Sequence, residues 1–167
     1  MGTFAEHLTA DGPNSHKPKR LELFGRLVGS WRVHDRQLDV ATGLWIGSER
    51  QWIFSWILDG RGVQDVIVAL EGDNDGVTLG TTVRVYDRAL GLWRVNWFGP
   101  AAGNYCTLVA SAHRNGIRQD GTDTDGQPIR WNFSNVTTDS FEWDGWISLD
   151  DGATWLLEQH MEARRES

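Results

Sequence analysis

The chain has 167 residues, a length typical of a single domain, and a formal net charge of −7. The negative charge argues against partners such as nucleic acid or an anionic membrane surface, and no apolar run approaches membrane-spanning length. The single cysteine, Cys106, excludes an internal disulfide and is expected to be a small buried residue.

The N-terminal segment, residues 1–18, is polar and is predicted to be loose. It lacks the apolar stretch of a secretory signal, so we expect a cytoplasmic protein of bacterial type. Residues 19–28 place Leu21, Phe24 and Leu27 at helical spacing, which predicts one short amphipathic helix.

From Gly29 onward, short apolar runs alternate with turn residues, a pattern typical of β-strands. A meander of such strands must expose two edges or close, and closure is the common solution. We therefore expect residues 19–167 to form one all-β domain, an antiparallel up-and-down β-barrel of about ten strands with a short N-terminal helix. The predicted strands cover about 29–40, 45–57, 63–70, 81–86, 92–98, 104–113, the two stretches on either side of the Asp125–Gly126 turn, 140–148 and 154–164.

The faces of the central strands follow from the expected hairpin registers. Pairing Val85 with Trp93 predicts an inner face of valine and tryptophan and leaves Arg84 and Tyr86 outside. This choice makes the interior apolar at the fourth and fifth strands of the meander.

The hairpin around Asp59 offers two registers. Pairing Trp56 with Gln64 gives an inner face that is apolar except for Gln64. The other register pairs Phe54 with Asp65. We choose the first register because its buried face contains fewer polar side chains.

Two later turns predict that Ser111, Asp120 and Trp131 lie side by side on three neighbouring strands. The pattern favours this mixed polar and aromatic face as the inner one, because the opposite choice would expose Trp131. Asp120 would then lie inside the barrel.

The start of the meander carries a familiar pattern. A short helix, then Gly29-x-Trp31 opening the first strand, then an even number of antiparallel strands, resembles the lipocalin/calycin superfamily. The resemblance implies that Trp31 plugs the closed end of the barrel and that a late arginine packs over it. Because the tenth strand returns to that end, Arg164 or Arg165 is expected to stack on Trp31 by a cation–π interaction.

Residues from about 20 to 165 also resemble uncharacterised bacterial lipocalin-like proteins of the DUF1579-type group. The similar stretches are LVGSW, IFSWILDGRGVQDV, VRVYDRALGLWRVNW and SFEWDGW. This resemblance implies a calycin barrel and little settled function.

Residues 148–155, SLDDGATW, match the Asp-box pattern S-x-D-x-G-x-T-W. The serine and aspartate side chains of this pattern tie a turn while the tryptophan packs beneath it. The Asp box occurs in sialidases, where it is structural, so we interpret it here as the hairpin between the last two strands and not as glycosidase chemistry.

Motifs for phosphate binding, nucleophilic catalysis or metal binding are absent, and the five histidines have no metal-ligand spacing. We expect no metal and no cofactor. A lesser alternative is haem binding, because small haem-binding barrels of the nitrobindin type use a histidine near the C-terminus, as His160 is here. The apolar alternation of the last strand nevertheless turns His160 outward. The carboxylates of Glu158 and Glu162 share a face that we interpret as solvated.

The ten tryptophans exceed what packing alone usually requires, and tryptophan readily lines sites for apolar or aromatic ligands. The favoured function is binding of a small apolar or aromatic molecule inside the barrel. The predicted ligand-binding residues are Trp52, Phe54, Gln64, Trp97, Trp131, Trp143 and Gln159.

The alternative is a cofactor-independent enzyme, a cyclase, isomerase or lyase acting on a small hydrophobic substrate of secondary or aromatic metabolism. An aspartate inside an aromatic barrel has a raised pKa and can move a proton, which makes Asp35 and Asp120 the candidate catalytic residues. A third hypothesis is an interaction role, in which the barrel is filled by side chains and its outer surface contacts a partner. A homodimer is a further possibility that the sequence leaves open.

Overall fold

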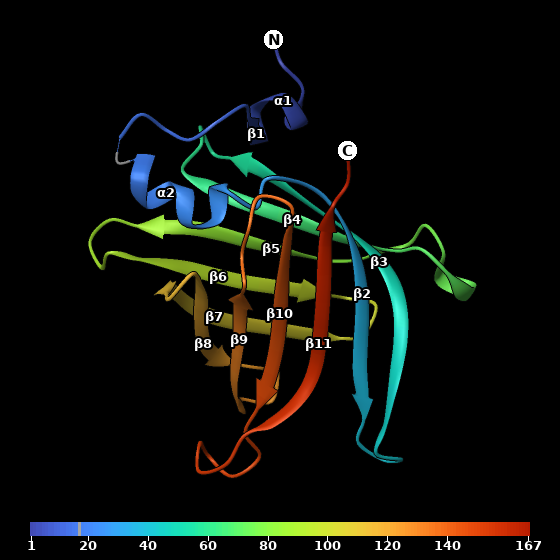
Figure 1. The fold of residues 1–167 in the computed structure, drawn as a ribbon. Coiled ribbons are helices and arrows are strands. Elements are labelled where there is room, and N and C mark those ends of the chain that lie inside the picture. The colour runs from blue at the N-terminus through green and yellow to red at the C-terminus, as the bar shows by residue number, and fades with distance from the viewer. Residues whose placement is uncertain (17) are drawn as a thin grey trace.

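The computed structural model describes residues 1–16 and 18–167, and in it ten antiparallel strands form one closed barrel (Figure 1). Each strand pairs with the next in the chain, and the last pairs with the first. The predicted fold class is therefore confirmed. The strands are β2 (Gly29–Asp39), β3 (Leu44–Ile57), β4 (Gly62–Ala69), β5 (Thr78–Asp87), β6 (Leu92–Gly99), β7 (Asn104–His113), β8 (Gly116–Thr122), β9 (Pro128–Ser134), β10 (Ser140–Ile147) and β11 (Leu156–Arg165).

The N-terminal segment carries more structure than its composition predicts. A short helix α1 (Phe4–Leu8) leads into β1 (Thr9–Ala10), which pairs with the end of β3. The expected amphipathic helix is α2 (Pro18–Gly25), and a 3₁₀ turn, η1 (Gly72–Asn74), interrupts the connection from β4 to β5. No helix in the described part of the chain is long and apolar enough to cross a membrane.

Helix α2 lies across one end of the barrel and closes it (Figure 1). Its residues Leu21 and Phe24, together with Leu27, are buried, as the helical spacing predicts. Phe24 packs edge-on against Trp93, with ring centroids 5.0 Å apart. These contacts make the closed end an aromatic core that continues down the inside of the barrel.

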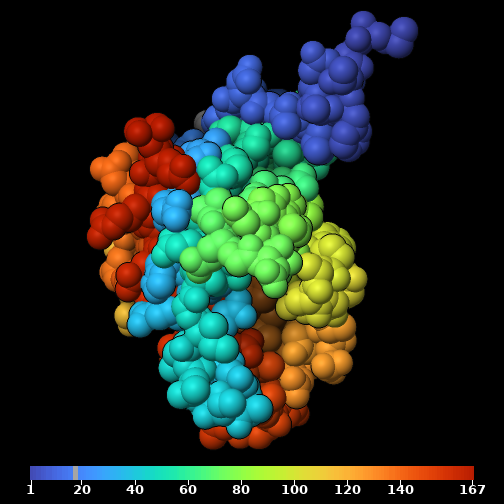
Figure 2. All heavy atoms as spheres, turned by 90° about the vertical axis from the view of Figure 1, so that its right-hand side faces the viewer, coloured from blue at the N-terminus to red at the C-terminus, as the bar shows by residue number. Residues whose placement is uncertain are grey.

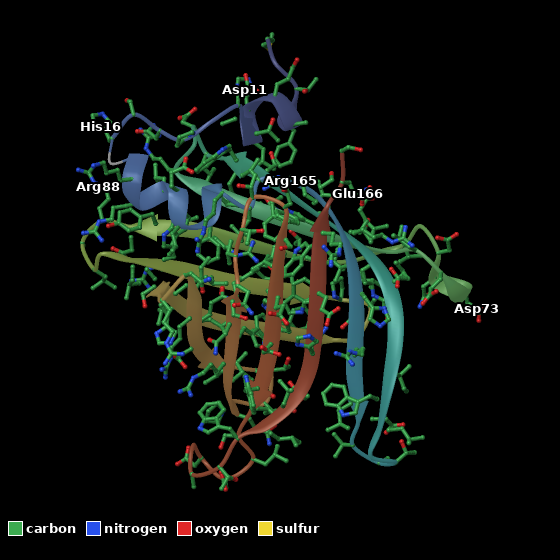
Figure 3. The ribbon with its side chains drawn as sticks, in the orientation of Figure 1. Asp11, His16, Asp73, Arg88, Arg165 and Glu166 are labelled. Carbon is green, nitrogen blue, oxygen red and sulfur yellow. The ribbon has the colours of Figure 1, made fainter. Side chains whose placement is uncertain are left out.

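Arg165 lies at the end of the barrel that α2 closes (Figure 3). There it stacks on Trp31, which is fully buried. Its Cζ lies 4.1 Å from the centroid of the indole. Its guanidinium also donates to the backbone carbonyls of Val28 at 2.8 Å, Arg26 at 2.9 Å and Thr138 at 2.7 Å. The expected cation–π contact is thus confirmed and is made by the second of the two candidate arginines.

The register chosen for β3 and β4 is wrong. Phe54 pairs with Asp65, and Trp56 pairs with Val63. Leu58, Asp59 and Gly60 all have positive φ and form a tight turn that imposes this pairing. Because a shift of one residue moves every side chain to the other face, Asp65 enters the interior and Gln64 turns outward.

The register chosen for β5 and β6 is also wrong by one residue. Tyr86 pairs with Trp93 and Arg84 pairs with Val95. Residues 88–91 form a four-residue turn between the two strands. The register was predicted wrongly because the pattern of valines and tryptophans does not indicate the length of this turn. As a result Arg84 lies inside the barrel, opposite to the predicted face, with 2 % of its surface exposed.

The prediction that Ser111, Asp120 and Trp131 lie side by side on β7, β8 and β9 is wrong. Val109 and Arg130 are the neighbours of Asp120, and Trp131 pairs with Gln119. Asp120 therefore lies outside, and the buried polar residue of β8 is Gln119. The inward position expected for Trp131 is confirmed.

The Asp box forms the β10–β11 hairpin, as predicted. The Ser148 hydroxyl donates to Asp150 Oδ1 at 2.9 Å and accepts from the Gly152 amide at 2.7 Å, and the Thr154 amide donates to Asp150 Oδ1 at 2.7 Å. Trp155 lies on the outer side of the barrel under the guanidinium of Arg130. The Cζ of Arg130 is 4.4 Å from the centroid of the Trp155 ring.

Replacement of Arg165 by methionine should lower the free energy of unfolding by about 2 kcal/mol, because it removes a stacked cation and leaves three backbone carbonyls without a donor. Urea denaturation measures the change. The matched control is Arg164→Met, which removes an exposed arginine of the same strand and should change stability by less than about 0.5 kcal/mol. Equal losses in the two variants would contradict the role given to Arg165.

Candidate functional site

A cavity of about 470 Å³ occupies the barrel on the side away from α2, within the usual size range of sites for small molecules. Its mouth lies among the β2–β3 turn and the loops after β4 and β6, and Figure 2 shows a recess between these segments.

The wall of the cavity is aromatic. Four tryptophans from four different strands line it, and they are Trp52, Trp97, Trp131 and Trp143. The rings of Trp131 and Trp143 have centroids 5.4 Å apart, and those of Trp52 and Trp143 are 6.5 Å apart. Alternation along each strand turns these side chains inward, and the indoles of Trp52, Trp143 and Trp131 pack in sequence along the wall.

The structure brings together five of the seven residues predicted to bind a ligand, namely the four tryptophans and Gln159. Phe54 does not line the cavity, because it packs behind Trp52 with ring centroids 4.9 Å apart. Gln64 lies on the outer face, where its amide donates to the Thr81 hydroxyl at 3.0 Å. Its predicted inward position is wrong for the register reason given above.

Asp35 lines the cavity and is buried, as its alternation from Trp31 predicts. Its carboxylate accepts from Gln159 Nε2 at 2.9 Å and from Gln37 Nε2 at 3.0 Å, and Arg50 Nε lies 3.7 Å away. Burial raises the pKa of Asp35, and the two amide hydrogen bonds only partly oppose that effect. Asp35 is therefore a carboxyl group whose proton affinity is increased and which borders the cavity.

Asp120, the other candidate acid, belongs to a solvent-facing network. It accepts from Arg118 Nε at 2.8 Å and from Arg130 Nε at 2.7 Å. Partial burial acts to raise the pKa of Asp120, but the hydrogen bonds from Arg130 and Arg118 outweigh it and lower the pKa. The predicted inward position of Asp120 is wrong, and its carboxylate does not border the cavity.

Sequence reasoning missed the ion pair of Asp65 and Arg84, which lies at the inner end of the cavity. Arg84 Nη2 donates to Asp65 Oδ2 at 2.6 Å, and the Thr82 amide donates to Asp65 Oδ1 at 2.8 Å. Both ion-pairing side chains are almost fully buried. The signal was available, since the rejected β3–β4 register placed Asp65 inside and called for a buried partner.

Glu158 was expected on a solvated face with Glu162, and that expectation is wrong. A β-bulge opposite Gly145 and Trp146 adds a residue to β11 at this point, and Glu158 borders the cavity. Burial raises the pKa of Glu158, and the charge of Asp123 adds to the effect. A bulge breaks the alternation from which faces are predicted.

Cys106 is buried on β7, as expected. Burial raises the pKa of its thiol to about 12, so the thiolate is not populated near neutral pH. Cys106 is thus unsuited to act as a nucleophile.

His160 faces outward, as predicted. Its Nδ1 lies 2.7 Å from Asp144 Oδ1, and its Nε2 lies 3.5 Å from Glu162 and 3.9 Å from Glu142. Among the described residues, His160, Glu142 and Glu162 are the group whose side-chain atoms could hold a metal ion. No histidine borders the cavity in the part of the chain that the structure describes, so a haem placed there would find no axial imidazole.

A second hollow lies outside the barrel at the closed end, between α2 and the ends of β5 to β8. Its rim carries the cationic side chains of Lys19, Arg20, Arg26 and Arg114. Its volume is about 570 Å³, and it lies on the outer surface, whereas the cavity of about 470 Å³ lies inside the barrel.

No family model matches the chain, and no curated protein matches it. Two solved structures share its fold. The S-type phycobiliprotein lyase CpeS from Guillardia theta has a TM-score of 0.58 and 13% identity, over 87% of this chain and 92% of that chain. The protein Rv2717c from M. tuberculosis has a TM-score of 0.61 and 13% identity, over 89% of this chain and 98% of that chain.

At 13% identity these likenesses show a shared barrel fold, which is the fold that the resemblance to the lipocalin/calycin superfamily implies. The narrower resemblance to the DUF1579-type group stays a prediction.

The two aspartates should give opposite pH dependences of stability. Folding raises the pKa of Asp35, so its ionisation destabilises the fold progressively as the pH rises from about 4 through the folded-state pKa. Asp35→Asn should therefore gain stability relative to wild type as the pH rises. Urea denaturation between pH 3 and pH 8, roughly the range of carboxyl titration, measures this trend.

Asp120→Asn is the matched control. Folding lowers the pKa of Asp120, so its contribution is present above the unfolded-state pKa and is lost as the pH falls. This variant should lose stability relative to wild type as the pH rises. Trends of the same sign in both variants would contradict the environments described for the two carboxyl groups.

Proposed function

We propose that this protein binds a small apolar or aromatic molecule inside the barrel. The observation that carries the proposal is the cavity of about 470 Å³, walled by four tryptophans and open at one end only. Sites for small molecules are typically concave and mostly apolar, with a few polar groups at defined positions. The buried polar groups around Asp35 and Arg84 supply such positions here.

The arrangement of the two ends supports binding in preference to a filled barrel used as a surface. The closed end is packed by α2, Trp31 and Arg165, whereas the other half leaves space between the tryptophan side chains. An indole wall stacks on flat aromatic molecules and excludes water from them.

A cofactor-independent enzyme is the second candidate, and Asp35 favours it. A buried carboxyl group with a raised pKa, fixed by two glutamine amides beside an apolar cavity, is suited to general acid–base catalysis. One neighbour with the same fold is named a phycobiliprotein lyase, which supports an enzymatic role on this architecture. Haem binding is disfavoured by the outward position of His160.

The binding proposal is tested with N-phenyl-1-naphthylamine, a neutral apolar probe whose fluorescence rises in a dry site. Wild-type protein should bind the probe, and Trp131→Ala should weaken binding about fivefold because it removes a stacking partner worth about 1 kcal/mol. Trp155→Ala removes a tryptophan outside the barrel and should leave binding unchanged. No probe fluorescence in wild-type protein, or equal losses in the two variants, would count against a ligand in the cavity.

The enzymatic alternative requires a substrate, which native mass spectrometry of the protein as purified can identify as a retained small molecule. Asp35→Asn should slow conversion of that molecule at least about 100-fold while changing its affinity little, because only the proton transfer is removed. Asp120→Asn is the control and should retain full turnover. Unchanged turnover in Asp35→Asn would remove the alternative.

A further inference from the structure

The inner end of the cavity holds hydrogen-bond donors that the protein itself does not satisfy. Arg84 lies there with its guanidinium against Phe24 and Phe54, at 5.1 Å and 5.2 Å from their ring centroids. Of the three guanidinium nitrogens, Nη2 is the one that donates to Asp65. Within the described residues, Nε and Nη1 of Arg84 have no partner although both atoms are buried.

Trp52 adds a third free donor at the same end. Its Nε1 is buried and has no partner in the described part of the chain, and its ring packs on Phe54, which also contacts Arg84. Both Trp52 and Arg84 line the cavity. The donor of Trp97, nearer the mouth, is by contrast satisfied by Asn104 Oδ1 at 3.0 Å. Among the described residues that line the cavity, the buried donors without a partner therefore belong to Arg84 and Trp52, and the buried acceptor without a partner is Gln119 Oε1. Leaving such buried atoms unpaired is costly.

The charges around this end favour a neutral acceptor over an anion. The charge of Arg84 is already balanced by Asp65 at 2.6 Å, and the charge of Asp35 faces Arg50 at 3.7 Å. Glu158 borders the same cavity and contributes no positive charge. A ligand carboxylate would therefore add an unbalanced buried charge, which costs much more than burying a paired neutral oxygen.

We propose that the inner end of the cavity binds the carbonyl oxygen of a neutral aromatic ketone or quinone, with Arg84 and Trp52 as the donors. This inference rests on the proposed binding function and adds the chemical class of the ligand. The aromatic body of the ligand lies between the tryptophans, and its oxygen points toward the closed end of the barrel.

Three probes that share one fused ring system test the proposal: 9-fluorenone, fluorene and fluorene-9-carboxylate. Titration followed by tryptophan fluorescence should show that wild-type protein binds 9-fluorenone at least about tenfold more tightly than either of the others, because only the ketone satisfies the donors without adding charge. The carbonyl stretching frequency of bound 9-fluorenone should fall below its value in an apolar solvent, as hydrogen bonding requires.

Trp52→Phe keeps an aromatic ring and removes the donor, so it should reduce the preference for 9-fluorenone over fluorene about fivefold. Arg84→Lys keeps the charge opposite Asp65 and removes the planar set of donors, so it should act in the same direction. Trp97→Phe is the control: it changes the wall equally for both probes and should leave the ratio of their affinities as in wild type, because its own donor is bound to Asn104.

The outcomes separate this inference from the function on which it rests. Equal binding of 9-fluorenone and fluorene, as expected if water alone satisfies the donors, would overturn the carbonyl site and leave a cavity that binds aromatic molecules. A preference for fluorene-9-carboxylate would overturn it in favour of an anion site. Binding of none of the probes would overturn both proposals.

Discussion

The buried ion pair of Asp65 and Arg84 is the constraint on which the interior of this barrel depends. The observed registers pair Phe54 with Asp65 and Arg84 with Val95, and they turn both charged side chains into the barrel. Together they satisfy each other at 2.6 Å. Such a pair adds little to net stability, but breaking it is costly, and a one-residue slip of either strand would break it. We infer that the pair specifies the register of β3 to β6 and thereby selects the faces that line the cavity.

The two ends of the barrel differ in packing: one is filled by side chains and the other leaves space. At the closed end, Arg165 donates to three backbone carbonyls and stacks on the ring of Trp31, and α2 supplies apolar side chains. Toward the open end the wall stays aromatic, but the side chains leave space. A rigid plug at one end lets the other end remain open without loss of a packed core, which is the arrangement that a ligand site requires.

The polar groups of the cavity form two sets that can take part in different chemistry. Near the mouth, Asp35 is held by Gln37 and Gln159, and burial raises its pKa. At the inner end, Arg84 and Trp52 present donors without acceptors. The first set can exchange a proton and the second can fix an oxygen atom. A ligand that spans the cavity would meet both sets, which is why we propose binding as the function and proton-transfer chemistry as the alternative.

The sequence by itself determined the closed barrel, the amphipathic helix, the contact between Trp31 and a late arginine, the Asp-box hairpin and an interior lined by tryptophan. These features depend on local turns, on helical spacing and on whether the number of strands is even, and each of these can be obtained from the order of residues in the sequence. It did not determine the inner position of Arg84, Asp65, Gln119 and Glu158, or the outer position of Gln64 and Asp120. Those depend on hairpin registers and on one β-bulge, because a shift of a single residue exchanges the two faces of a strand. Only the tertiary structure decided them, since the partner that makes a buried charge tolerable lies on another strand.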